Sequence, residues 1–318
     1  MRKFVLCMCM MIVVASSCNK DDVITIDFDD KYYRAATQTS AAECSVVLEY
    51  MPAPGQFIGD KKTGGFTGEE LTASAANEYA AARLDEQKFV SLGGFGGYMV
   101  VAFDHSVDNS EGYDIAVAGN AFNGSSEPAV VWVMQDKNGD GKANDGWYEL
   151  KGSESESSST VRNYSVTYYR PEKDCSAVHW SDNLGGEGTI DYLAAYHSQP
   201  SYYPAWVDSD SYTLSGCCLE ARNHDTSGNG THWVQPSYGW GYADNYSAVD
   251  WVDKVGDKNV KANLLDIANA IDKDGKSVEL RYIDFVKIQT AVNAKSGWLG
   301  ELSAEVLGVY DYNLMIAK

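Results

Sequence analysis

Apolar residues in this chain recur mainly with a period of two, which is the spacing of a half-buried β-strand. The segments with this period are rich in β-branched and aromatic residues, and clusters of Gly, Asn or Asp bound them, as expected for turns. Pro52 and Pro54 end the first segment, because proline fixes the backbone and lacks a hydrogen-bond donor. The predicted strands are residues 45–50, 98–103, 115–118, 130–134, 164–169 and 278–290.

The C-terminal pattern indicates how the sheets are covered. In residues 278–290 both alternating faces are apolar, so we expect a central strand that is buried on both sides. Asp274-Gly275 predicts a tight turn just before it. A last strand follows, with an apolar face of Leu302, Ala304, Val306, Tyr310 and Tyr312. These features are typical of a β-sandwich or jelly roll. We predict an all-β, mainly antiparallel fold in one large domain, residues 45–318.

One segment predicts a helix, so the fold should contain one or two short helices. Thr67 and Glu70 have the spacing of a capping box, in which a threonine and a glutamate three residues on satisfy the first backbone amides. Apolar residues then recur at helical spacing. The expected buried face comprises Leu71, Ala75, Tyr79 and Ala82.

The N-terminus has the parts of a secretory signal peptide. Arg2 and Lys3 supply the positive start, and the apolar run 4–15 is too short to span a bilayer core. Small residues lead directly into Cys18, which resembles the lipidated cysteine of bacterial lipoproteins. We predict removal of residues 1–17, lipidation of Cys18 and a tether over residues 18–44. The acidic start of this tether resembles the signal that sends Bacteroidetes lipoproteins to the outer cell surface, which implies an outer-membrane location.

Charge and cysteine content limit the partners. The chain has 25 Lys and Arg against 45 Asp and Glu, for a net charge of −20. This balance argues against nucleic acid as a partner. Outside the cytoplasm, four cysteines of the predicted mature domain can form two disulfides, and their spacing favours neither a pairing nor a metal site. They are Cys44, Cys175, Cys217 and Cys218.

A polar loop between the predicted strands 130–134 and 147–150 has the spacing of a calcium loop. Oxygen-bearing side chains stand at its first, third and fifth positions, and Gly141 at the sixth permits a sharp turn. The expected Ca²⁺ ligands are Asp136, Asn138, Asp140, the carbonyl of Lys142, Asp145 and, as a further candidate, Glu149. The alternative is an ordinary polar hairpin loop, since Asn, Asp and Gly also dominate turns.

Aromatic residues are concentrated between residues 179 and 251, interleaved with polar residues and glycine. Such rings can stack on a flat or puckered ligand while polar neighbours fix its orientation. The alternative is that they fill the core. We predict a ligand face on the loops 180–203 and 233–245. Its candidate residues are Trp180, Tyr202, Tyr203, Trp206, Trp233, Tyr238, Trp240, Tyr242 and Asn245.

No sequence motif indicates catalysis. The chain contains no Gly-x-Ser-x-Gly elbow, His-Glu-x-x-His helix, phosphate-binding loop or dinucleotide fingerprint. Its five histidines are scattered. A glycosidase needs only two carboxylates that meet in space, so this class stays open as a minor alternative. We expect a protein that is not an enzyme.

Several runs together resemble the "cell surface protein" lipoproteins common in gut Bacteroidetes. They include EYMPAPGQFIGD, GGYMVVAFDHSV, YDIAVAGNAF, EPAVVWVMQDKNGDGKANDGWYELKGSE, GWGYADN and YIDFVKIQTAVNAKSGWLGELSAEV. The resemblance covers nearly all of the mature chain. Some lipoproteins of this kind are similar to accessory members of cobalamin-uptake loci, which capture the corrinoid and pass it to a TonB-dependent transporter. It therefore implies cobalamin binding, with glycan binding as the alternative and a structural adhesin as a further one.

Overall fold

The protein is built mainly from antiparallel sheets, as predicted. The computed structural model describes residues 24–25 and 30–317, so the predicted signal peptide and Cys18 lie outside the described residues. Its helices are α1 (Ala73–Asp85) and α2 (Tyr312–Ile316), with 3-10 turns η1 (Asp30–Tyr32), η2 (Ile267–Asn269) and η3 (Gly297–Leu299). None of the helices in this part of the chain is long and apolar enough to cross a bilayer.

The largest sheet has six strands in the order β16-β7-β6-β18-β4-β2. These are β2 (Val46–Met51), β4 (Tyr98–Asp108), β6 (Ala129–Met134), β7 (Tyr148–Leu150), β16 (Ala270–Ile271) and β18 (Tyr282–Thr290). Every residue of β18 except Lys287 is buried, and the strand lies between β4 and β6. The prediction of a central strand covered on both sides is confirmed. Its N-terminal part is separate, however, because β17 (Val278–Glu279) pairs with β1 (Ile24–Thr25).

A second sheet, in the order β14-β15-β5-β20, packs on the first to form a sandwich. It comprises β5 (Ile115–Ala118), β14 (Trp251–Val252), β15 (Ala262–Leu265) and β20 (Gly308–Asp311). Ile115 and Val117 of β5 share the main core with Val101 and Val286 of the first sheet, whereas the alternate residue Ala116 packs on the other side. The two-residue period of the sequence thus divides β5 between two apolar clusters.

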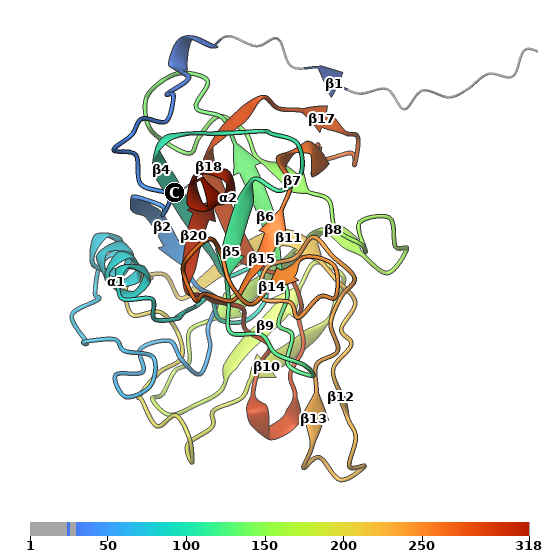
Figure 1. Cartoon of the computed structure of the whole chain (residues 1–318). Helices are drawn as coiled ribbons and strands as arrows, with labels where there is room; N and C mark the ends of the chain where they lie inside the picture. Colours follow the sequence, from blue (N-terminus) through green and yellow to red (C-terminus); the bar gives the residue numbers. More distant parts are fainter. Residues whose placement is uncertain (1–23, 26–29, 318) are drawn as a thin grey trace, which may run out of the picture.

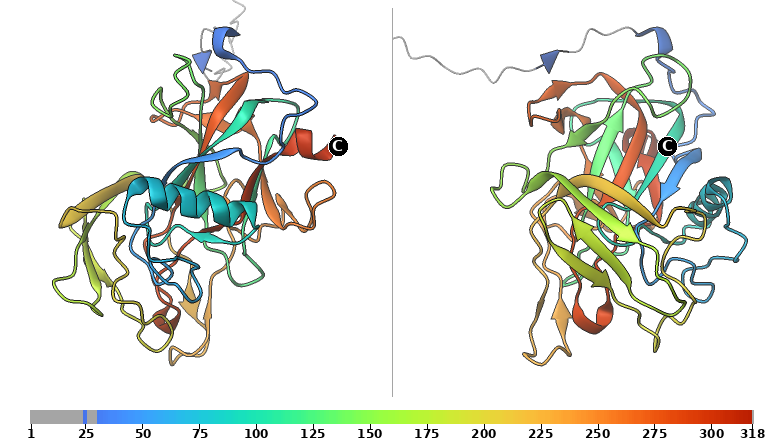
Figure 2. Two further views of the ribbon diagram at one scale, coloured as in Figure 1. Left: turned by 90° about the vertical axis from the view of Figure 1, so that its left-hand side faces the viewer. Right: turned by 180° about the vertical axis from the view of Figure 1, so that it is seen from behind.

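A third sheet extends the core at one end. Its order is β10-β9-β8-β11, with β8 (Val161–Tyr169), β9 (Val178–Asp182), β10 (Glu187–Ile190) and β11 (Ser211–Cys218). Val166, Tyr168 and Leu214 join the main core. Nearby, the hairpin of β12 (His224–Asp225) and β13 (Trp233–Val234) and the turn η3 project at the end of the molecule opposite β1 and η1 (Figures 1 and 2). The short pair β3 (Val90–Ser91) and β19 (Glu305–Val306) completes the sheets.

Helix α1 forms close to where it was predicted, but with a different start and buried face. Thr72 caps it, because its hydroxyl accepts a hydrogen bond from the Ala75 amide. The Thr67–Glu70 bonds exist within the preceding turn instead. The buried residues are Ala76, Tyr79, Ala80 and Leu84, so the predicted face is wrong except at Tyr79. The helix lies along the edge strand β2.

Three further expectations need correction. The predicted final strand is divided into β19 and β20, and Tyr312 begins α2. From residue 30 onward the predicted tether packs on the sandwich: Arg34 pairs with Asp284 at 3.1 Å, and the amide of Cys44 donates to the carbonyl of Val309. The four described cysteines are all free thiols, so the expected disulfides are absent from the described residues.

Candidate functional site: a buried acidic pocket

A pocket of about 270 Å³ lies near η3 and is lined by an unusual set of acids. Three carboxylates face it, those of Glu127, Glu301 and Glu305. Gln56, Gln235, His197, Ser125 and Ser303 add further polar groups, and Phe57, Tyr196, Trp298 and Leu299 supply the apolar part of the lining. The pocket thus combines hydrogen-bond acceptors with aromatic rings, which is the composition of many small-ligand sites.

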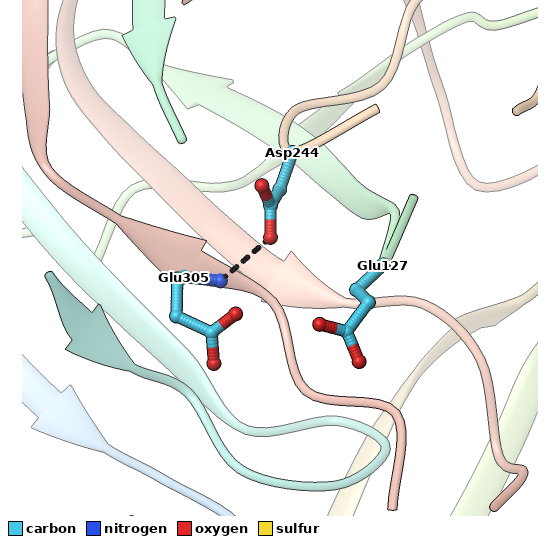
Figure 3. Close-up of side chains that lie close together, drawn as sticks. All are labelled: Glu127, Asp244 and Glu305. Atoms are coloured by element: carbon cyan, nitrogen blue, oxygen red, sulfur yellow. Dashed lines mark hydrogen bonds between the residues drawn. The ribbon is translucent and has the colours of Figure 1, made fainter. Parts of the chain in front are cut away.

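Beneath the pocket, Glu127 and Glu305 meet Asp244. One carboxylate oxygen of each residue lies within 4.8 Å of the others, and Figure 3 shows the three carboxyl groups pointing toward one another. Among the described residues, no other group of three Asp, Glu, His or Cys side chains is this compact. We call Glu127, Asp244 and Glu305 the acidic triad.

Backbone hydrogen bonds from three distant segments hold the triad in place. Glu127 comes just before β6, and its amide donates to the carbonyl of Asp244 at 3.0 Å. Glu305 is in β19, and its amide donates to Oδ2 of Asp244 at 2.9 Å (Figure 3). Asp244 has a left-handed backbone with φ of 49°, which is uncommon for a residue other than glycine. Strained backbone of this kind is often found at functional sites.

Backbone amides donate to both oxygens of the Asp244 side chain. Its Oδ1 accepts hydrogen bonds from the amides of Asn120 and Ala121 at 3.0 and 2.9 Å. Together with the bond from Glu305, three backbone amides converge on one side chain that is 1% exposed. Amide donors of this kind stabilise the charged form. Oδ2 accepts only one of these bonds and keeps a lone pair on the side of the triad.

Glu301 adds a fourth acid to the same pocket. Residues 301–305 are extended, so Glu301, Ser303 and Glu305 share one side, opposite Leu302 and Ala304. Glu301 is only 4% exposed. Its Oε1 accepts a hydrogen bond from the amide of Gln56 at 2.7 Å, whereas its Oε2 is buried without any hydrogen-bond partner. A buried acceptor without a partner is costly, and such groups are rare.

The four acids carry no compensating positive charge. None of the ion pairs between described residues involves Glu127, Asp244, Glu301 or Glu305. Burial raises the pKa of Glu127 and Glu305 above the usual range, and the neighbouring carboxylates raise each of them further. Burial also raises the pKa of Asp244, against its three amide donors, and raises the pKa of Glu301 to about 7. These shifts mean that the four acids resist full ionisation together.

Two aromatic rings stand at the mouth of the pocket. Tyr196 and Trp298 are 57% and 46% exposed, and their ring centroids are 5.8 Å apart. Deeper in the lining, His197 is buried, with Nδ1 3.0 Å from a carboxylate oxygen of Asp60. Its ring also meets Phe57 edge-on at 4.8 Å. Exposed, paired rings above a polar floor are suited to stacking against a ligand.

Most of the predicted ligand face is core instead. Tyr202, Tyr203 and Trp206 belong to the main hydrophobic core, and Tyr238 and Tyr242 belong to a second buried cluster. All five are at most 8% exposed. They therefore present no surface to a ligand in this structure, and the alternative interpretation of these rings as core residues is the correct one.

The remaining candidates are not brought together. Trp180 and Trp240 line two different pockets of about 320 Å³ each, and the Trp233 indole donates to the carbonyl of Gly230. Asn245 is fully buried, and its side chain bonds to both the amide and the carbonyl of Tyr238. Asn245 thus fixes the loop that carries Asp244 and does not face a ligand.

The predicted calcium loop is a hairpin loop between β6 and β7, as the sequence indicated. Asp136 accepts hydrogen bonds from the amides of Gly139 and Gly141 at 2.7 and 2.9 Å, and Asp140 accepts one from Lys142. Glu149 leaves the loop and lies 3.4 Å from Arg162. Carboxylates of this loop do not form a compact group of three, so calcium binding at Asp136, Asn138, Asp140, Lys142 and Asp145 stays a prediction.

Sequence reasoning did not identify the acidic pocket. The one local signal is the run Glu301-Leu302-Ser303-Ala304-Glu305, in which polar and apolar residues alternate. The sequence prediction uses only its apolar residues, as one face of a strand. Comparison of the chain with protein-family models and with curated proteins gives no match. What the pocket can bind therefore has to follow from its own geometry.

Proposed function

We propose that this protein is a cell-surface lipoprotein that binds a small polyhydroxylated ligand, such as a sugar unit of a glycan, in the acidic pocket without transforming it. The observation that supports this most directly is the combination of an exposed aromatic pair, Tyr196 and Trp298, with a floor of carboxylate and amide acceptors. Sugars need both features, because one face of the ring is apolar while its hydroxyl groups donate hydrogen bonds.

Pocket size favours a sugar over cobalamin. Four pockets formed by the described residues have volumes of about 270 to 430 Å³. These values lie at the lower end of the range of roughly 300–1,000 Å³ that encloses drug-sized ligands. A corrinoid with its nucleotide loop is larger than a drug-sized ligand, so it would have to lie across the surface. Capture of cobalamin, which the sequence resemblance implies, is thus the less favoured form of the proposal.

The position of the pocket fits a protein attached to a membrane at its N-terminus. Residues 30–32 and β1 lie at one end of the molecule, and η3 with Trp298 lies near the other (Figures 1 and 2). We propose that a lipid anchor at Cys18 leaves the end of the molecule that carries η3 accessible to ligand. A TonB-dependent transporter is the partner that we propose to receive the ligand.

Carboxylate spacing favours binding over hydrolysis. Glycosidases use two carboxyl groups roughly 5–5.5 Å apart for retention of configuration, or roughly 6.5–9.5 Å apart for inversion. The oxygens of the triad lie within 4.8 Å of one another, closer than either arrangement. The triad is therefore better suited to share one small cation than to flank a glycosidic bond.

The proposal is tested by calorimetric titration of the purified protein with a panel of mono- and oligosaccharides chosen from a glycan array, and with cyanocobalamin. We expect saturable sugar binding at one equivalent. Replacing Trp298 by alanine should weaken it roughly tenfold, because loss of one well-packed aromatic contact costs about 1–2 kcal/mol. Trp298 is exposed, so the substitution should leave the melting temperature nearly unchanged.

Tyr246 provides a matched control. It is an exposed tyrosine, 39% exposed, that also pairs with a tryptophan, Trp251, at 5.4 Å, and it does not line the acidic pocket. Tyr246→Ala should bind the sugar like the unsubstituted protein. Binding of cyanocobalamin but of no sugar would contradict the proposed ligand, and equal affinities for the Trp298 and Tyr246 variants would contradict the proposed site. Release of reducing sugar during the titration would show that the protein is a hydrolase.

A further inference from the structure

We propose that the acidic triad binds one Ca²⁺ ion, with part of its coordination sphere open to the pocket. This site is distinct from the loop at Asp136, on which the calcium pattern of the sequence falls. Calcium binding here does not depend on sugar binding. Two observations support it: the arrangement of Glu127, Asp244 and Glu305, and the unpaired oxygen of Glu301.

The geometry suits Ca²⁺. This ion takes six to eight oxygen ligands at roughly 2.3–2.6 Å, so two ligands on opposite sides of it are about 5 Å apart. The three triad oxygens lie within 4.8 Å of one another, and all of them can therefore contact one ion without large movement. Mg²⁺ keeps most of its water and is seldom held by a cage of protein oxygens, so it fits less well.

The buried carboxylates of the triad favour a bound cation. Three carboxylates buried together repel one another, and a buried charge without a counter-charge costs several kcal/mol. No Lys or Arg of the described ion pairs reaches the triad. The remaining ways to lower the cost are protonation and a bound cation. The three backbone amides that donate to Asp244 favour its charged form, and a bound cation would stabilise that form further.

Glu301 provides an independent observation. Its Oε2 has no hydrogen-bond partner although the residue is only 4% exposed, and the side chain lines the same pocket as Glu127 and Glu305. Its charge is close enough to raise the pKa of Glu127. An oxygen left in this state can accept from water or from a ligand on the open side of the ion.

Calorimetric titration of the purified, chelator-treated protein with CaCl₂ tests the site. We expect one Ca²⁺ to bind per protein molecule. In Glu305→Gln and in Glu127→Gln this binding should be lost, or its affinity should fall at least tenfold, since even removal of outer partners of a metal ligand costs roughly 10–100-fold in affinity. Asp140→Asn is the matched control, because it removes one carboxylate from the loop and leaves the triad intact. This variant should still bind one Ca²⁺ at the triad.

Melting temperatures supply a second readout. At 100 times Kd, Ca²⁺ should raise the melting temperature of the unsubstituted protein and of Asp140→Asn by roughly 5–10 °C, but not that of the Gln variants. In chelator, both Gln variants should melt at or above the unsubstituted protein, because glutamine has nearly the shape of glutamate and never carries a buried charge. Absence of Ca²⁺ binding, or binding that Asp140→Asn abolishes and both Gln variants retain, overturns the proposal. The proposal is also overturned if, in chelator, both Gln variants melt well below the unsubstituted protein.

Discussion

Replacing Asn245 by alanine distinguishes a structural role from a ligand-binding role at the position where sequence and structure disagree most clearly. The sequence placed Asn245 on the ligand face. In the structure its Oδ1 accepts from the Tyr238 amide at 2.8 Å and its Nδ2 donates to the Tyr238 carbonyl at 3.1 Å, and the residue is fully buried. The loop between these two residues is closed by this pair of bonds.

The expected loss follows from what alanine leaves behind. The amide and the carbonyl of Tyr238 would each remain without these partners in a place that water does not reach, at about 1–3 kcal/mol apiece. We therefore expect Asn245→Ala to lower the free energy of unfolding by roughly 3 kcal/mol. In a domain of this size, that corresponds to a fall of roughly 5–10 °C in the melting temperature. Differential scanning calorimetry measures both quantities.

Asn183 is a matched control. Its Oδ1 accepts from the Ser165 amide at 3.1 Å and its Nδ2 donates to the Asn163 carbonyl at 2.8 Å, which is the same pair of bonds on an exposed residue. Water can replace these bonds, so Asn183→Ala should cost at most about 1 kcal/mol. If Asn245→Ala melted like the unsubstituted protein and lost ligand binding instead, our assignment of a structural role would be refuted.

Three further predictions concern other parts of the molecule. Trp240→Ala should leave sugar affinity unchanged in calorimetry, because Trp240 lines a different pocket from Trp298. Burial lowers the pKa of Lys287 to about 8, so Lys287 should add up to about 3 kcal/mol of stability as pH increases from about 8 toward its unfolded value near 10.4. Denaturant titrations should show this gain as a difference between the unsubstituted protein and Lys287→Met, because buried thiols with raised pKa values lower the stability of both proteins over the same range. Reductant should leave the melting temperature unchanged, and a thiol reagent should count one free thiol for each described cysteine in the unfolded protein, because Cys44, Cys175, Cys217 and Cys218 are unpaired.

Much of the sandwich could be predicted because its strands are long and follow the two-residue period. The segments 115–118 and 130–134 match β5 and β6 to within a residue. β4 continues beyond its apolar part, which the period could not show: His105 and Ser106 are polar but buried, where they pair with Asp311 and Asp284. In the sequence, polar residues of this kind indicate the end of a strand, because their distant hydrogen-bond partners cannot be seen there.

The aromatic region misled the prediction for a related reason. Interleaved polar residues in the sequence predict exposed rings. Tyrosine, however, can be buried if its hydroxyl finds a partner, and the hydroxyls of Tyr202 and Tyr238 donate to the carbonyls of His197 and Glu220. The polar tips of these rings are therefore used inside the protein.

Convergence of distant segments explains both why the acidic triad escaped prediction and why it matters for the fold. Glu127, Asp244 and Glu305 come from different parts of the sequence, and the hydrogen bonds that Asp244 accepts from the amides of Glu127 and Glu305 bring them together. The same bonds connect the sandwich to the loop of Asp244. A cation in the triad would therefore tie these segments together and shape the pocket floor at once, so that ligand affinity and stability should respond together to chelation.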